Sequence, residues 1–227
     1  MISCHPTQEM LEKFANGELP ATLAAAVSIH AEMCSECKAQ IAAYTEQQAE
    51  SGFNGVSSHA SSANVNDEDV FAGIDIDDLI AAITATDEID IALEDKEKTI
   101  TVKGKEYVLP RALTNMTMSN WSSIGKLARS RVELGEGEIR ASLLQIQPGG
   151  SVPEHTHKGF ELTLLLDGSF EDDMGVYGPG DFIVLDGKHT HNPVSHEGCL
   201  CYTVSNDAQH FTQGINKLLN PFGSFIY

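Results

Sequence analysis

The chain has 227 residues, enough for two small domains that each bury a modest core. Its net charge is −19, and residues 1–98 hold 19 acidic against 4 basic side chains. Such a surface repels nucleic acid, which argues against direct nucleic-acid binding, and attracts basic partners; it is equally compatible with a surface that only maintains solubility. No apolar run reaches membrane-span length, and residues 1–16 lack the apolar core of a signal peptide, so we expect a cytoplasmic protein without membrane contact.

Short helices are expected at the N-terminal end. The spacing of Met10 and Phe14 predicts a helix over residues 6–17. Pro20 suits the first turn of a second helix, and a third is expected over residues 34–50. A helical segment this small has little core, so a bound metal would add useful folding free energy.

Three metal-ligand residue types follow one another as His-x3-Cys-x2-Cys: His30, Cys34 and Cys37. On continuous or nearly continuous helix, this spacing projects all three side chains to one side. Cysteine sulfur and histidine nitrogen are the ligands that zinc favours, and His5 is the natural fourth ligand, with Cys4 as the substitute. The alternative is a Cys-x2-Cys redox pair beside an incidental histidine.

Residues 51–66 are rich in Gly, Ser and Asn, and are expected to form a flexible connection. Residues 67–95 carry many acidic side chains and the spacing of an amphipathic helix. Its apolar stripe, a candidate partner-binding surface, consists of Ile76, Leu79, Ile80 and Ile83. Packing of this stripe within its own domain would explain the pattern equally well.

After about residue 98 the pattern changes to short strands separated by Gly, Pro and Asp turns, which predicts an all-β sandwich or barrel. His155 and His157 are two apart, so on a strand both point to the same face, and Glu161 follows at an even offset. Two imidazoles and a carboxylate suit zinc, iron, manganese, nickel or copper. The stretch Gly149 to Gly168 reads G-x5-H-x-H-x3-E-x6-G and resembles the first motif of the cupin superfamily.

A second cupin-like motif begins at Gly180 and places the fourth ligand at His191, although His189 is evenly spaced from it and competes. Three positions depart from the family pattern: Asp186, Lys188 and Ser195.

The two motif sets, in this order, resemble the ChrR-type zinc anti-sigma factors. That resemblance implies a two-domain α + β protein: a helical anti-sigma domain over residues 1–95, a connection over 96–110 and an antiparallel barrel or jelly-roll cupin over 111–227. It implies that His5, His30, Cys34 and Cys37 hold one zinc, with a second zinc or another divalent metal in the cupin. In that family, four helices wrap an ECF (group IV) sigma factor and block its contacts with RNA polymerase and promoter DNA. A 1:1 complex, released by singlet oxygen or organic peroxide, is therefore expected.

Cys199 and Cys201 share a strand face and are expected to be buried small side chains or, alternatively, an oxidation sensor near the metal. The remaining histidines, His59, His196 and His210, are expected on the surface. Two other functions remain open: a cupin metalloenzyme, such as a dioxygenase or isomerase with a structural zinc module, and a cupin regulator that binds a small ligand. The helical module favours the regulatory function, because a plain cupin enzyme has no use for it.

Overall fold

The structure is a computed structural model, and it describes residues 2–59, 76–85, 97–157, 159–206 and 209–211, with side chains omitted at 54–59, 76 and 209–211. It divides into two compact units. The first joins Met1–Gln48 to Glu97–Tyr227, and the second is Ala49–Lys96. The expected combination of a helical N-terminal segment with a β-rich C-terminal part is confirmed, whereas the domain boundaries stay a prediction.

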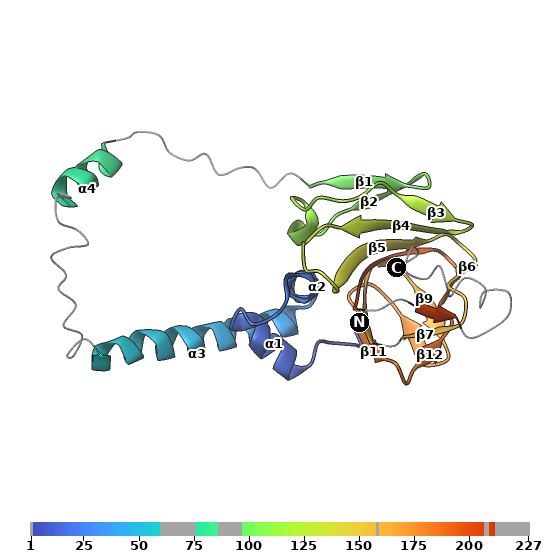
Figure 1. Cartoon of the computed structure of the whole chain (residues 1–227), viewed down its shortest axis with the longest axis horizontal. Helices are drawn as coiled ribbons and strands as arrows, with labels where there is room; N and C mark the ends of the chain where they lie inside the picture. Colours follow the sequence, from blue (N-terminus) through green and yellow to red (C-terminus); the bar gives the residue numbers. More distant parts are fainter. Residues whose placement is uncertain (1, 60–75, 86–96, 158, 207–208, 212–227) are drawn as a thin grey trace. The chain divides into compact units, whose positions relative to one another are not determined.

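Three helices open the chain: α1 (Gln8–Ala15), α2 (Ala21–Met33) and α3 (Ser35–His59) (Figure 1). The Thr7 hydroxyl caps α1 by accepting a hydrogen bond from the Met10 amide at 3.2 Å. Pro20 precedes α2 and provides no side-chain cap, so the first amides of that helix depend on a partner elsewhere in the chain.

Residues 51–59 continue α3 as helix, which corrects the expectation of a flexible connection from residue 51. Glycine and serine are weak helix formers, but extending a helix that already exists is far easier than starting one. Residues 60–66 lie outside the described residues.

The second unit contains α4 (Ile76–Thr84), which is shorter than the helix expected over 67–95; the flanking residues 67–75 and 86–95 lie outside the described residues. Leu79, Ile80 and Ile83 are 52%, 52% and 64% exposed, and the side chain of Ile76 is not described. The described side chains of the apolar stripe are therefore exposed, as are the other described side chains of α4.

Among the described residues, all paired strands run antiparallel, and they form separate sheets rather than one closed barrel. The largest sheet has the order β11-β8-β14-β5-β4-β3: Phe182–Asp186, Phe160–Gly168, Cys199–Ser205, Arg140–Ile146, Leu127–Val132 and Ser122–Ile124. A second sheet has the order β10-β9-β13-β6: Gly175–Tyr177, Phe170–Asp172, Val194–Ser195 and Gly150–Ser151. A third is β12-β7-β15: Thr190–His191, His155–His157 and Gln209–Phe211.

The expected connection over 96–110 is largely a hairpin of β1 (Thr99–Val102) and β2 (Lys105–Val108), followed by the 3-10 turn η1 (Arg111–Leu113). Tyr107 is buried in the same hydrophobic cluster as the large sheet. The hairpin is thus a folded part of the first unit.

Helix α2 packs against the β-rich part of its unit and contacts η1 and β14. Its apolar side chains share one core with those of the large sheet, including Ile29, Leu164 and Tyr202. The Tyr202 hydroxyl, buried in this interface, donates to the Thr22 carbonyl at 3.0 Å. Glu136, from the loop between β4 and β5, accepts from the amides of Ala21 and Thr22 and thereby supplies the missing cap of α2.

Candidate metal centres

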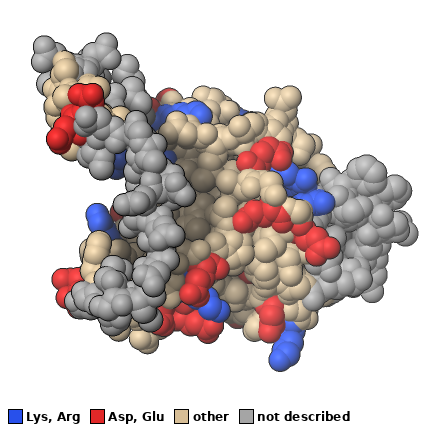
Figure 2. Space-filling view, turned by 60° about the vertical axis from the view of Figure 1, so that its left-hand side comes forward, with Lys and Arg blue, Asp and Glu red and all other residues tan. Residues whose placement is uncertain are grey.

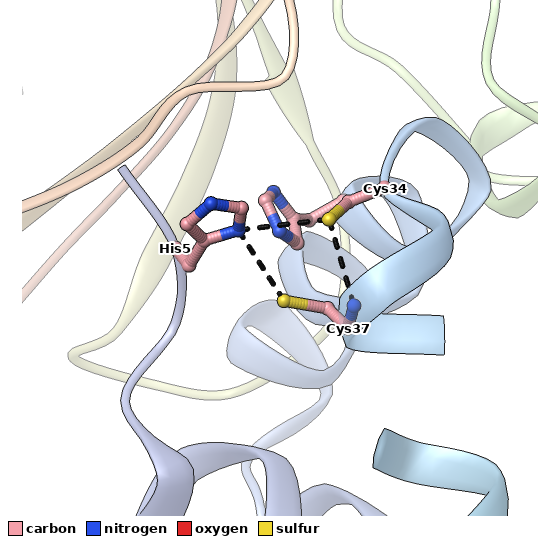
Figure 3. A group of neighbouring side chains, drawn as sticks. His5, Cys34 and Cys37 are labelled. Atoms are coloured by element: carbon pink, nitrogen blue, oxygen red, sulfur yellow. Dashed lines mark hydrogen bonds between the residues drawn. The ribbon is translucent and has the colours of Figure 1, made fainter. Parts of the chain in front are cut away.

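The ligand atoms of His5, His30, Cys34 and Cys37 lie within 4.8 Å of one another. The Nδ1 atom of His5 lies 3.6 Å from Cys34 Sγ and 3.4 Å from Cys37 Sγ, and Figure 3 shows its ring turned toward both sulfurs. Zinc bonds of about 2.3 Å to sulfur and 2.0–2.1 Å to nitrogen, at a tetrahedral angle, separate such atoms by about 3.5 Å. The arrangement fits a single small tetrahedral ion.

Local structure explains how these side chains meet. His30 lies in the last turn of α2, Cys34 is the residue between α2 and α3, and Cys37 lies in the first turn of α3. The break at Cys34 lets the Cys37 amide donate to its sulfur at 3.5 Å. His5 arrives from the extended segment before α1, so two helices and one extended segment build the group.

The buried nitrogen and sulfur atoms of this group also favour the binding of a cation. The Nδ1–H of His30 donates to the Gly180 carbonyl at 2.8 Å, which leaves Nε2 as the lone-pair nitrogen. That Nε2 is buried without a hydrogen-bond partner in the described part of the chain, and burial lowers the pKa of His30. Burial and the Cys34 sulfur raise the pKa of Cys37 to about 12, so its thiolate needs a neutralising cation.

A second group consists of His155, His157, Glu161 and His191, all buried, with ligand atoms again within 4.8 Å of one another. The Nε2 atoms of His155 and His191 are 3.0 Å apart. The Glu161 Oε2 atom lies 2.8 Å from Nε2 of His157, 3.4 Å from that of His191 and 3.9 Å from that of His155. Burial raises the pKa of Glu161, but hydrogen bonds to the three imidazoles outweigh it and lower the pKa well below its ordinary value.

Neighbouring groups orient the histidines of this second group. The Nδ1–H of His155 donates to the Pro153 carbonyl at 2.8 Å, which directs Nε2 into the group. The Nδ1 of His191 lies 3.3 Å from the buried carboxylate of Asp172 on β9. Burial alone lowers the pKa of His191, and the carboxylates of Glu161 and Asp172 together raise it above its ordinary value.

The structure distinguishes between the alternatives at both sites. His5, not Cys4, joins the first group, since Cys4 packs against a second hydrophobic cluster that includes Ile146 and Leu165. His191, not His189, joins the second, because the exposed His189 ring bonds to Asp186 at 2.8 Å instead. His196 is exposed as expected, whereas the side chains of His59 and His210 are not described.

A cavity opens beside the second group, and apolar side chains form much of its wall: Leu144, Ile146, Val152, Phe170, Ile183 and Leu185. Cys201 also lines it, and its sulfur lies 3.9 Å from that of Cys199. Both thiols are buried, as expected for small core side chains. The hydrogen bond between them lowers the pKa of Cys199 and raises that of Cys201.

Sequence reasoning missed the residues that support the ligands. Asp172 orients His191, and Glu136 caps the helix that carries His30. Asp172 belongs to no motif, and Glu136 lies more than a hundred residues from the helix that it caps. Only the weak signal of an acidic side chain in a short strand or turn marks either position.

Comparison with known protein families finds a match in the β-rich part of the chain. Residues 110–209 match the family of ChrR Cupin-like domains. The β-rich part is thus similar to a ChrR-like cupin domain, and a helical segment with a candidate metal group precedes it.

Individual relatives then narrow the resemblance. The chain is 36% identical over 104 residues to the anti-sigma-E factor ChrR of Cereibacter sphaeroides, a match over 45% of this chain that spans about half of that relative, 49%. It is also similar to a chain of the crystal structure of Rhodobacter sphaeroides SigE in complex with the anti-sigma ChrR, with a TM-score of 0.61 and 24% identity over 90% of this chain and 99% of that one. The resemblance to ChrR-type proteins is thereby confirmed, and the solved structure shares the fold.

The charged side chains on the surface are relevant to the kind of partner that the chain could bind. On the face drawn in Figure 2, acidic side chains form several separate groups with fewer basic ones between them. Within the described ranges, no helix is both long enough and apolar enough to cross a membrane.

Proposed function

We propose that this chain is an anti-sigma factor that binds and inhibits an ECF (group IV) sigma factor in a 1:1 complex in the cytoplasm. One observation carries the proposal: a sulfur-containing ligand group on N-terminal helices and a ChrR-like cupin occur in one chain, in that order. The similarity to the anti-sigma-E factor ChrR of Cereibacter sphaeroides supports the same role.

We assign zinc to the group of His5, His30, Cys34 and Cys37, where it would act structurally by joining the start of the chain to α2 and α3. The cupin group offers three imidazoles and one carboxylate, a set that zinc accepts and that other divalent metals also accept. A metal there would supply a positive charge that holds its four ligands in one arrangement. No catalytic role is assigned to any residue.

The proposed partner surface includes the exposed apolar stripe of α4. Leu79, Ile80 and Ile83 expose apolar side chains. The acidic Asp77 and Asp78 lie in the first turn of the same helix. Ile76 completes the stripe by its position in the sequence. A partner that fits this helix has an apolar groove with basic side chains at its rim, because apolar contacts then gain from desolvation while opposite charges steer association.

The signal is proposed to be an oxidant, singlet oxygen or an organic peroxide, that acts at the cupin. The apolar cavity beside the metal ligands gives a small apolar oxidant a place to reach them. Oxidation of a ligand, or of Cys201 in the cavity wall, would change the cupin and favour release of the sigma factor only if the two states of the chain bind it differently.

Affinity purification tests this function. A tagged chain should recover one ECF sigma factor from cells of its source at equal stoichiometry, and metal analysis of the complex should give zinc. Recovery of the metal-loaded chain without any sigma factor would contradict the proposal.

The same apolar cavity supports a second candidate function, a cupin dioxygenase or isomerase with a structural zinc module. Oxygen uptake or isomerisation by the metal-loaded chain, retained when Cys34 is replaced by Ser, would favour the enzyme. Loss of sigma binding in that variant without any turnover favours the regulator.

A further inference from the structure

A corner of the cupin, formed by Gly180, Asp181 and Phe182, binds the segment that precedes His5. The Asp181 Oδ1 atom accepts hydrogen bonds from the amides of Ser3 at 2.6 Å and Cys4 at 2.9 Å. The Phe182 amide returns a hydrogen bond to the Cys4 carbonyl at 3.0 Å. Three hydrogen bonds thus fix the backbone immediately before a metal ligand that itself lies outside any helix.

The same corner holds a second ligand. The Gly180 carbonyl accepts the Nδ1–H of His30, and the Phe182 ring packs edge-on against that imidazole with centroids 5.7 Å apart. Gly180 has a φ of +91°, and a Cβ there would collide with the side chain of Ile2. The positive φ favours glycine at this turn, and the Ile2 side chain would have to shift to admit any other residue.

Asp181 is itself held firmly. Its Oδ2 atom accepts from the Gly178 amide at 2.8 Å, so both carboxylate oxygens have backbone donors. Hydrogen bonds from amides to a carboxylate are stronger than those between neutral groups. Burial raises the pKa of Asp181, but the amides of Gly178, Ser3 and Cys4 outweigh it and lower the pKa, so the group is ionised at neutral pH.

We infer that Asp181 is a positioning residue for the N-terminal metal centre: it fixes the segment that carries His5 while the adjacent Gly180 carbonyl orients His30. The cupin thereby sets the metal affinity of the helical module. This inference rests on the proposed metal centre, but not on the identity of any sigma factor.

The location of the corner gives this role a consequence. Asp181 immediately precedes β11, and further along that strand Leu185 pairs with Glu161 of the cupin group. One strand therefore links the corner that positions two N-terminal ligands to a ligand of the second centre. A shift of β11 in register or angle would reach both centres.

Cobalt titration of the full chain tests the inference, with a chelator in competition. Thiolate-to-cobalt charge-transfer absorption reports only the N-terminal centre, because the cupin group contains no sulfur. Asp181→Ala should weaken cobalt binding at the sulfur centre by about 10- to 100-fold, the range for lost ligand-orienting contacts. Asp181→Asn should restore part of the affinity, since its carbonyl oxygen still accepts from Ser3 or Cys4.

Asp167→Ala is the matched control, because this carboxylate bonds to Lys105 on the hairpin and should leave the charge-transfer titration unchanged. Cobalt that binds without producing thiolate charge-transfer bands is bound at the cupin group, and its presence in each variant reports that the cupin is folded. Wild-type affinity and spectrum in Asp181→Ala would overturn the inference; if that variant does not fold, wild-type affinity in Asp181→Ser, whose side chain is too short to accept from both amides, would do so. Absence of sulfur bands in the unsubstituted chain would instead overturn the metal centre itself.

Discussion

At the scale of single residues, the two ligand groups offer different ligand atoms to a metal. The N-terminal group combines two thiols with two imidazoles, whereas the cupin group has three imidazoles and a carboxylate. Thiolates bind zinc strongly and must lose their protons to do so, which couples metal binding to folding in a segment with a small core. We therefore expect the first group to be structural and the second to be the responsive one.

Replacing Cys34 with Ser should remove one metal ion per chain and loosen the helices of residues 1–48. The reason is that a hydroxyl is a poor zinc ligand, so the metal no longer joins α2 and α3. Metal content and far-ultraviolet circular dichroism measure the two effects. Cys199→Ser is the control, since that thiol is buried in the cupin and should leave both values unchanged. Full helicity and two metals in Cys34→Ser would contradict a structural role.

The ligands could be predicted from the sequence because their spacing reflects local geometry. His30, Cys34 and Cys37 lie within eight residues, and the helical period brings them to one side across the break at Cys34. His155 and His157 alternate along β7, whereas Glu161 lies on β8 in another sheet, so the strand period alone does not place Glu161 beside them. Asp181, which meets Ser3 across 178 residues, has no such local signature. Contacts of this kind depend on how elements pack, which spacing does not encode.

At the scale of elements, helix α2 depends on the cupin for its N-terminal cap. Glu136→Ala removes the acceptor for the amides of Ala21 and Thr22 and should lower the free energy of unfolding by about 1 kcal/mol at pH 7. Urea unfolding measures the loss. Glu133→Ala, an exposed carboxylate in the same loop, should have little effect.

The pH dependence of this cap has a definite sign. Burial raises the pKa of Glu136, but the Thr22 and Ala21 amides outweigh it and hold the pKa below the ordinary 4.5. The contribution to stability is therefore complete above about pH 4.5 and disappears as the pH falls through the lower pKa of the folded chain. The difference between wild type and Glu136→Ala should shrink below pH 4.5, and a constant difference would show that the carboxylate is not the cap.

Helix α4 should contribute directly to partner binding. Changing Leu79 and Ile83 together to Asp should weaken the sigma complex by at least about 100-fold, because buried apolar anchors contribute roughly 2 kcal/mol each. Calorimetry or gel filtration measures the affinity, and cupin metal content shows that the first unit is intact. Val176→Asp, at an exposed apolar position in β10, is the control. Unchanged affinity would indicate that α4 has no place in the interface.

The elements themselves were predictable to different extents. Short strands separated by Gly, Pro and Asp turns predicted the β-rich part of the chain. The structure then shows alternation of buried and less buried side chains in strands such as β4. The predicted end of the third helix was wrong. The composition of residues 51–59 suggested a flexible connection, but a helix that already exists favours its own continuation. Docking of α2 on the β-rich part of its unit was not predicted, since its alanine-rich surface suits many partners.

At the scale of the whole molecule, the proposal separates inhibition from response. Glu161→Ala or His157→Ala should leave inhibition of the sigma factor intact but reduce induction by singlet oxygen or organic peroxide, because the cupin centre is the proposed sensor. Cys199→Ser and Cys201→Ser should have weaker effects. A sigma-dependent reporter measures output with and without oxidant, and normal induction in the Glu161 and His157 variants would exclude the cupin metal as the sensor.

Transcription with purified components tests the central claim most directly. Core RNA polymerase, the recovered ECF sigma factor and its promoter template are combined with increasing amounts of the chain. The account predicts that transcription falls to background at one chain per sigma factor, and that Cys34→Ser does not inhibit at the same ratio. Undiminished transcription at several equivalents of the zinc-loaded chain would contradict the role of anti-sigma factor.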